Sequence, residues 1–235
     1  MDYDSFFKLV KIKPEEIESA KVYLNRRGIQ EHINVANYLS KKLGRTPTYC
    51  EVASTMRYDK RIRRILYKFL GYLEENIRAY ISNKYPLEKD LPNGCSKFIG
   101  KDARDLAKNS NETFDLLSYD LFSNLVDVAY HLPNNDFAML FPNVKTKANK
   151  KALVSLRNKI GHNKFILDHK YLYNVTPGSE AKKDLSSSIN NLIIHLPLEF
   201  RKEAKKEISD AFLKHKNNYK YQVFWSLPRK IRIIL

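Results

Sequence analysis

The longest regular pattern of apolar residues in the chain runs from Asp59 to about Ser82, and it has the period of a helix. Apolar side chains recur there at spacings of three, four and seven, namely Ile62, Ile65, Leu66, Phe69, Leu73, Ile77, Tyr80 and Ile81. On a helix with 3.6 residues per turn they form one broad face. So long an apolar face must be covered by other elements, and the pattern therefore predicts a helical bundle.

Shorter segments repeat the same period, and only seven glycines occur in 235 residues. These features predict an all-α fold. We expect irregular connections at 86–110, with a short helix near 103–107, and at 165–177. Longer helices are expected near residues 14–27, 29–43, 111–131, 134–140, 153–160, 181–195 and 198–216. The expected organisation is an N-terminal helical extension (1–57), a helical bundle (58–216) and a basic and apolar C-terminal tail (217–235).

The chain carries 42 lysines and arginines against 26 acidic residues, a formal net charge of +16. This excess predicts an anionic partner, most simply RNA or DNA, although a lysine-rich proteome would give the same composition. No run approaches 18 apolar residues and the first residues do not resemble a signal peptide, so we expect a cytoplasmic protein without a membrane partner. Cys50 and Cys95 stand singly, which predicts reduced thiols, no metal site and no cofactor.

One segment carries residue types suited to catalysis: Arg157-Asn158, with His162 five positions after the arginine. Arginine grips a phosphate, and histidine gives or takes a proton near neutral pH. The pair suits attack of a ribose 2′-OH on the adjacent phosphate, which is cleavage of RNA without a metal. The alternative is a surface arginine and a histidine that caps a helix; the same spacing also occurs at Arg27 and His32.

Residues five apart on an ideal helix differ by about 140° around its axis, so Arg157 and His162 would diverge. We expect Gly161 to stop or distort the helix just before His162. A broken last turn would let the two side chains converge, and a second copy of the chain would also bring them together.

Segment 156–163 (LRNKIGHN) resembles the R-N-x-x-x-H motif of the HEPN superfamily, many of whose members are ribonucleases. Segments 58–64 (YDKRIRR), 73–78 (LEENIR) and 117–122 (LSYDLF) are similar, in order, to motifs of its Abi-like branch, the abortive-infection proteins of the AbiD/AbiF type. The resemblance covers roughly residues 20–200. It departs where Asp120 replaces a small residue and where Gly161 precedes the histidine.

The resemblance implies a HEPN-like bundle and a metal-independent endoribonuclease of phage defence that leaves 2′,3′-cyclic phosphate and 5′-hydroxyl ends. Arg157 and His162 would be catalytic and Asn158 would orient the arginine or the phosphate, with Glu74 and Arg78 in support. Two proton transfers and one motif per chain predict a homodimer whose motifs face a shared cleft. Lysines near the motif are expected to bind RNA: Lys147, Lys150, Lys151, Lys159 and Lys164.

Three alternatives remain open at this level. The chain could be a basic helical module that binds RNA or DNA without cutting it, held by an RNA or protein antitoxin. The second alternative is DNA binding by residues 43–53 (LGRTPTYCEVA), which resemble a sequence found in helix-turn-helix segments, although no separate recognition helix follows. A structural HEPN fold that pairs with a nucleotidyltransferase ranks lower, because Asn163-Lys164 follows His162 where that branch continues H-x-Y.

Overall fold

A computed structural model describes residues 3–108, 110–144, 150–176 and 179–217, and it confirms a mostly helical fold. The helices are α1 (Asp4–Phe7), α2 (Ile17–Arg27), α3 (Ile29–Leu43), α4 (Tyr49–Lys84), α5 (Lys101–Leu106), α6 (Thr113–Ser118), α7 (Phe122–His131), α8 (Asn134–Leu140), α9 (Lys150–Gly161), α10 (Leu185–His195) and α11 (Leu198–Asn217). A hairpin of β1 (Lys170–Thr176) and β2 (Ser179–Asp184) lies between α9 and α10 in the chain. No helix in these ranges is both long and apolar enough to cross a membrane.

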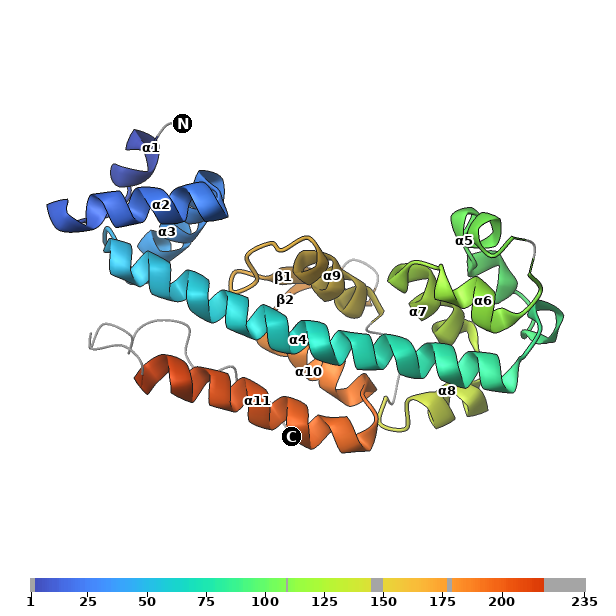
Figure 1. Cartoon of the computed structure of the whole chain (residues 1–235). Helices are drawn as coiled ribbons and strands as arrows, with labels where there is room; N and C mark the ends of the chain where they lie inside the picture. The colour runs from blue at the N-terminus through green and yellow to red at the C-terminus, as the bar shows by residue number, and fades with distance from the viewer. Residues whose placement is uncertain (1–2, 109, 145–149, 177–178, 218–235) are drawn as a thin grey trace.

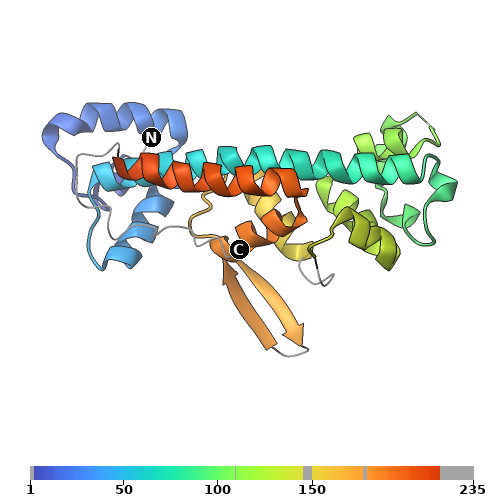
Figure 2. The ribbon, with the colours of Figure 1, turned by 90° about the horizontal axis from the view of Figure 1, so that it is seen from below.

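Helix α4 is the axis of the molecule. It has 36 residues and so spans about 54 Å. Helices α1–α3 lie at its N-terminal end, α5–α8 at its C-terminal end, and α9 and α10 against its middle, while α11 runs alongside it (Figures 1 and 2). The predicted apolar face packs against the core: Ile65 and Tyr80 are partly buried, and Ile62, Leu66, Phe69, Leu73, Ile77 and Ile81 are fully inaccessible.

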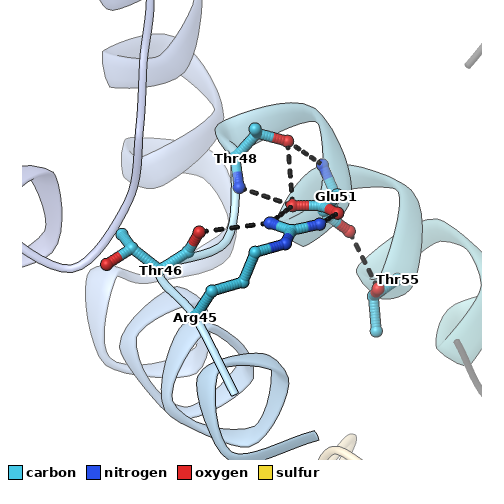
Figure 3. Close-up of polar contacts among 5 residues, drawn as sticks. All are labelled: Arg45, Thr46, Thr48, Glu51 and Thr55. Atoms are coloured by element: carbon cyan, nitrogen blue, oxygen red, sulfur yellow. Dashed lines mark hydrogen bonds and ion pairs between the residues drawn. The ribbon is translucent and has the colours of Figure 1, made fainter. Parts of the chain in front are cut away.

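The start of α4, ten residues before the expected one, is set by a capping box (Figure 3). Thr48 Oγ1 accepts a hydrogen bond from the Glu51 backbone N–H at 3.3 Å, and Glu51 Oε2 accepts one from the Thr48 N–H at 2.6 Å. Arg45 grips the same carboxylate with two nitrogens, at 2.6 and 3.1 Å. This arrangement satisfies backbone donors that the first helical turn leaves unpaired.

Burial alone would raise the pKa of the Glu51 carboxyl, but the bonds from Arg45 and from the Thr48 backbone outweigh it and hold that pKa below its ordinary value. Gly44, just before this turn, has φ of +66°, the left-handed conformation that ends α3. Residues 43–53 are therefore a turn between two packed helices, with Arg45 and Glu51 engaged with each other.

Two clusters of buried apolar residues divide along α4. The smaller one joins α1, α2, α3 and the start of α4, up to Val52, and the larger one begins at Tyr58 and includes residues of every later helix. The domain boundary that we expected at residue 57 falls inside the continuous helix α4, between the two clusters. The tail at 217–235 lies, apart from Asn217, outside the described residues.

The expected helix at 111–131 is broken in two, and the reason is Asp120. This carboxylate is 7% exposed and accepts hydrogen bonds from the N–H of Leu121 at 2.9 Å and from Asn124 Nδ2 at 2.8 Å, at the start of α7. It also accepts from the N–H of Gly100 at 3.3 Å, which ties the preceding connector to the same point. A buried carboxylate needs such partners, and satisfying them interrupts the helix.

The expected irregular segment at 165–177 is confirmed only up to residue 169, and the expectation of a helix from Ala181 was wrong. Residues 170–176 and 179–184 form an antiparallel hairpin in which Lys170 pairs with Asp184. Helix α10 begins only at Leu185, because Asp184 caps it by accepting a hydrogen bond from the Ser187 N–H at 3.0 Å. The sequence of β1, KYLYNVT, is rich in residues that favour strands.

His195, the last residue of α10, is 1% exposed. Its Nδ1 donates to the Asn191 carbonyl at 2.6 Å, which leaves Nε2 to accept from the Tyr130 hydroxyl at 2.7 Å. Burial lowers the pKa of His195 to about 4. The folded protein therefore holds this ring neutral in mildly acidic solution, where an exposed histidine is charged.

We predict that His195 makes the fold sensitive to acid. Between pH 6.5 and about 4 the unfolded chain binds a proton here that the folded chain does not, so stability falls as the pH falls. Urea unfolding at pH 7.0 and 5.0 should show that His195→Gln removes about 1–2 kcal/mol of this loss. His131→Gln, at an exposed histidine, is the control, and an unchanged pH dependence in His195→Gln would contradict the prediction.

Candidate nucleic-acid interface

Helix α9 carries the Arg157-Asn158…His162 motif, and its apolar face fixes which side chains point outward. Ala152, Leu153, Leu156 and Ile160 are buried, and α9 packs against α4, α7 and α10. These positions repeat at three and four, so they occupy one face of the helix. Asn158 and His162, four apart, are both exposed on another face.

The helix ends just before His162, as the sequence predicted, but Gly161 is not the residue that ends it. Gly161 is its last residue, and the stop comes at Asn163, whose φ of +53° is left-handed. The Asn163 N–H donates to the Ile160 carbonyl at 3.0 Å and the Lys164 N–H to the Lys159 carbonyl at 2.9 Å, the two bonds of a Schellman motif. The expectation that Gly161 breaks the helix was therefore wrong, since asparagine also tolerates this conformation.

Gly161 has a different neighbour, the guanidinium of Arg157. A Cβ at position 161 would lie 3.4 Å from Arg157 Nη1, so the arginine side chain runs along the helix and over the glycine. Arg157 is half-buried. Its positive charge lies at the last turn of α9, where the negative end of the helix dipole stabilises a cation.

Beside α9 lies an open groove of about 590 Å³, which we call the α9 groove. Six of the residues proposed from the sequence line it: Lys150, Lys151, Asn158, Lys159, His162 and Lys164. Its other lining residues are Ser123, Asp127, Val154 and Ser155. Lys147, also proposed, lies outside the described residues.

The four lysines of the α9 groove differ in their partners. Lys150 forms an ion pair with Asp127 across the groove, and Lys159 Nζ lies 3.0 Å from Asp168 Oδ1. Lys151 and Lys164 are exposed. With four cations and one carboxylate among its lining residues, the groove attracts anions, and its open shape suits an extended phosphate backbone.

Arg157 does not line the α9 groove, although His162 does. The helical backbone is regular between the two residues, up to the bond from the His162 N–H to the Asn158 carbonyl, so the two side chains leave it about 140° apart around the axis. Of the two routes by which they could meet, a broken last turn is absent. A second copy of the chain is the route that remains.

Glu74 and Arg78 form the expected ion pair, at 2.5 Å between Oε1 and Nη2. Arg78 Nε also donates to the Leu117 carbonyl at 2.8 Å, near the end of α6. Neither residue lines the α9 groove. Their contacts join α4 to α6 and do not place them beside His162.

The residues that the sequence did not single out are Asp59 and its partners. Asp59 is 1% exposed, and its Oδ1 accepts hydrogen bonds from the N–H groups of Ile166 and Leu167 at 2.8 and 3.2 Å. Its Oδ2 binds Arg63 Nε at 2.7 Å, and Arg63 Nη1 donates to Asn163 Oδ1 at 3.2 Å. Asp59 therefore fastens α4 to the segment that follows the motif helix.

Burial raises the pKa of the Asp59 carboxyl, and the two backbone N–H groups and Arg63 oppose that rise. The sequence did contain a signal: Asp59 stands three residues before Ile62, on the apolar face of α4. A carboxylate on such a face needs several partners.

Arg27 and His32 have the same spacing as Arg157 and His162, but the His32 imidazole is buried and does not reach the surface. His32 is 2% exposed, and its Nδ1 lies 2.9 Å from the Gly28 carbonyl oxygen. In the part of the chain that the structure describes, no group of three or more His, Cys, Asp or Glu side chains could hold a metal ion.

Comparisons of the chain with protein-family models, with curated proteins and with solved structures find no match. The resemblance to the HEPN superfamily thus rests on the motifs quoted above and stays a prediction.

We predict that Asp59→Ala lowers the free energy of unfolding by about 3 kcal/mol, because it leaves two backbone donors and a mostly buried arginine without their acceptor. Urea unfolding followed by circular dichroism measures the change. Asp102→Ala, which removes an exposed carboxylate from α5, is the control and should change stability by less than about 0.5 kcal/mol. A loss below about 1 kcal/mol in Asp59→Ala would contradict the role assigned to this carboxylate.

Proposed function

We propose that the chain is a metal-independent endoribonuclease that acts as a homodimer in phage defence. The observation that carries the proposal is the α9 groove, in which an exposed imidazole, His162, stands among four lysines. Lysines bind the phosphates of an RNA strand, and the imidazole transfers a proton at the scissile bond. The defence role rests on the resemblance to abortive-infection proteins.

In the proposed mechanism, Arg157 of one protomer meets His162 of the other. The guanidinium binds the scissile phosphate and stabilises the charge that grows on it when the 2′-oxygen attacks. His162 gives or takes a proton, and Asn158, four residues earlier on the same face, orients the phosphate. The second motif of a twofold dimer faces the same cleft and supplies the second imidazole.

Cleavage of labelled total RNA in EDTA tests this proposal. Wild-type protein, stripped of co-purified nucleic acid, should cut RNA and leave 2′,3′-cyclic phosphate and 5′-hydroxyl ends. Loss of a proton-transfer group typically costs about 10²–10⁴-fold, so His162→Ala should be nearly inactive. Arg157→Ala should lose a similar factor, about 10²–10³-fold, because it removes the charge that stabilises the transition state. His131→Ala and Arg64→Ala, at exposed residues outside the groove, are matched controls with wild-type activity.

Full activity in either motif variant would contradict the mechanism. Cleavage that requires a metal, or that leaves other ends, would contradict the reaction.

One observation favours a second function, that of a basic module that binds RNA or DNA without cutting it. Arg157 and His162 do not share the α9 groove within one chain, so a single protomer has a phosphate-binding surface without an assembled catalytic pair. An antitoxin RNA could occupy the same surface. No cleavage by wild-type protein, combined with tight RNA binding, would favour this function.

Both functions predict that Lys151 contacts phosphate. Each such contact adds about 0.7 to the slope of log K against log salt for a single strand. Lys151→Gln should therefore weaken binding of single-stranded RNA and reduce that slope by about this amount, as measured by fluorescence anisotropy from 50 to 200 mM KCl. Lys41→Gln, on the exposed side of α3, is the control, and equal slopes for the two variants would place the RNA elsewhere.

A further inference from the structure

A second hollow, of about 390 Å³, lies between the N-terminal helices and the first half of α4, and we call it the α4 pocket. Its walls come from α2, α3, α4 and the turn after α9. This volume is near the lower end of small-molecule pockets, which span about 300–1,000 Å³. The α4 pocket therefore has room for one small ligand and not for a strand of nucleic acid.

Three aromatic side chains line the α4 pocket: Tyr23, Tyr49 and Phe165. Tyr49 and Phe165 are buried and form the floor of the pocket with 6% and 7% of their surface exposed, whereas Tyr23, on α2, is 49% exposed at its rim. Beside them the pocket has an apolar wall of Val35, Ala53 and Met56. Aromatic rings and apolar side chains in a concave site are suited to stacking on a flat aromatic group.

The charged residues of the α4 pocket are mostly cationic. Four positive side chains stand against two carboxylates, namely Arg26, Arg57, Lys60 and Arg63 against Glu31 and Asp59. Asp59 and Arg63 form an ion pair and compensate each other, so three cationic side chains stand against Glu31. The remaining excess favours an anionic ligand, and arginine binds phosphate particularly well.

The α4 pocket and the α9 groove share the turn that ends α9. His162 and Lys164 line the groove, whereas the alternate residues Asn163 and Phe165 line the pocket. A ligand in the pocket would lie against Asn163, which directly follows His162, and against Arg63, which holds Asn163.

We propose that the α4 pocket binds one nucleotide, with its base among Tyr23, Tyr49 and Phe165 and its phosphate beside Arg26 and Arg57. The nucleotide is either a free molecule or one unit of an RNA chain. This site does not depend on whether the protein cuts RNA, because the pocket is lined by neither Arg157 nor His162.

Calorimetric titration of the full chain, stripped of nucleic acid, tests the proposal. The ligands are the four ribonucleoside 5′-monophosphates and a single-stranded tetranucleotide, with ribose 5-phosphate and adenosine as the two halves of a nucleotide. We expect saturable binding of at least one monophosphate at one site per chain, and at least tenfold weaker binding of both halves.

Variants at the rim of the pocket then locate the site. Tyr23→Ala should weaken nucleotide binding about tenfold through lost stacking, and Arg26→Gln should weaken it through a lost phosphate contact. Matched controls are Tyr67→Ala and Arg64→Gln, which change exposed residues of α4 outside the pocket and should leave the affinity unchanged.

The outcomes separate the sources of the nucleotide. A monophosphate that binds as tightly as the tetranucleotide assigns the site to a free nucleotide. Tighter binding of the tetranucleotide that is lost in Tyr23→Ala assigns it to a unit of RNA. No saturable binding, equal binding of ribose 5-phosphate, or binding that Tyr23→Ala and Arg26→Gln leave unchanged would overturn the proposal.

Discussion

The buried carboxylate of Asp59 is the contact on which the arrangement of this molecule depends. It accepts hydrogen bonds from the backbone N–H groups of residues 166 and 167 and from Arg63 on its own helix. A buried backbone N–H group without an acceptor destabilises the fold. The segment after α9 is therefore held where the N–H groups of residues 166 and 167 reach the Asp59 carboxylate. This contact sets the end of α9 against α4, between the two hollows, and thus fixes the turn that carries His162.

The length of α4 explains how one chain supports two apolar clusters. A helix of about 54 Å is longer than a single small core, so helices gather at both ends and along the middle. The capping box of Thr48 and Glu51 starts α4 at Tyr49, and the N-terminal helices pack against these first turns. The α4 pocket and the α9 groove flank the turn after α9, the pocket on the N-terminal side of α4 and the groove beside α7 and α9.

Local patterns in the sequence predicted the helices well and the breaks between them poorly. The apolar period located the long helix. The expected bounds of α3 and α8 agree with the structure, because local residues mark them: Gly28 and Gly44 flank α3, and Pro133 precedes α8. Asp120 and Asp59 are carboxylates whose burial could be suspected from their positions, but the Gly100 partner of Asp120 and the Ile166 partner of Asp59 lie 20 and 107 residues away in the chain, and no local pattern identifies them. The hairpin was missed although its composition favours strands.

The candidate site was predicted in part. Asn158, His162 and four of the five proposed lysines line one groove, because they lie on or next to one helix with a single outward face. The expected convergence of Arg157 and His162 within one chain fails, since Asn163 and not Gly161 ends the helix. Glu74 and Arg78 form their pair but connect other helices.

The central claim is that the catalytic pair is completed between two protomers. Co-expression of an Arg157→Ala chain and a His162→Ala chain with different tags, followed by purification through both tags, yields the mixed dimer. In this dimer one intact arginine faces one intact histidine, whereas each parent dimer lacks one of the two groups entirely. With one imidazole in place of two, the mixed dimer should cleave RNA more slowly than the wild-type dimer but faster than either parent. Activity no higher than that of the parents, in a dimer shown to be intact, would contradict the central claim.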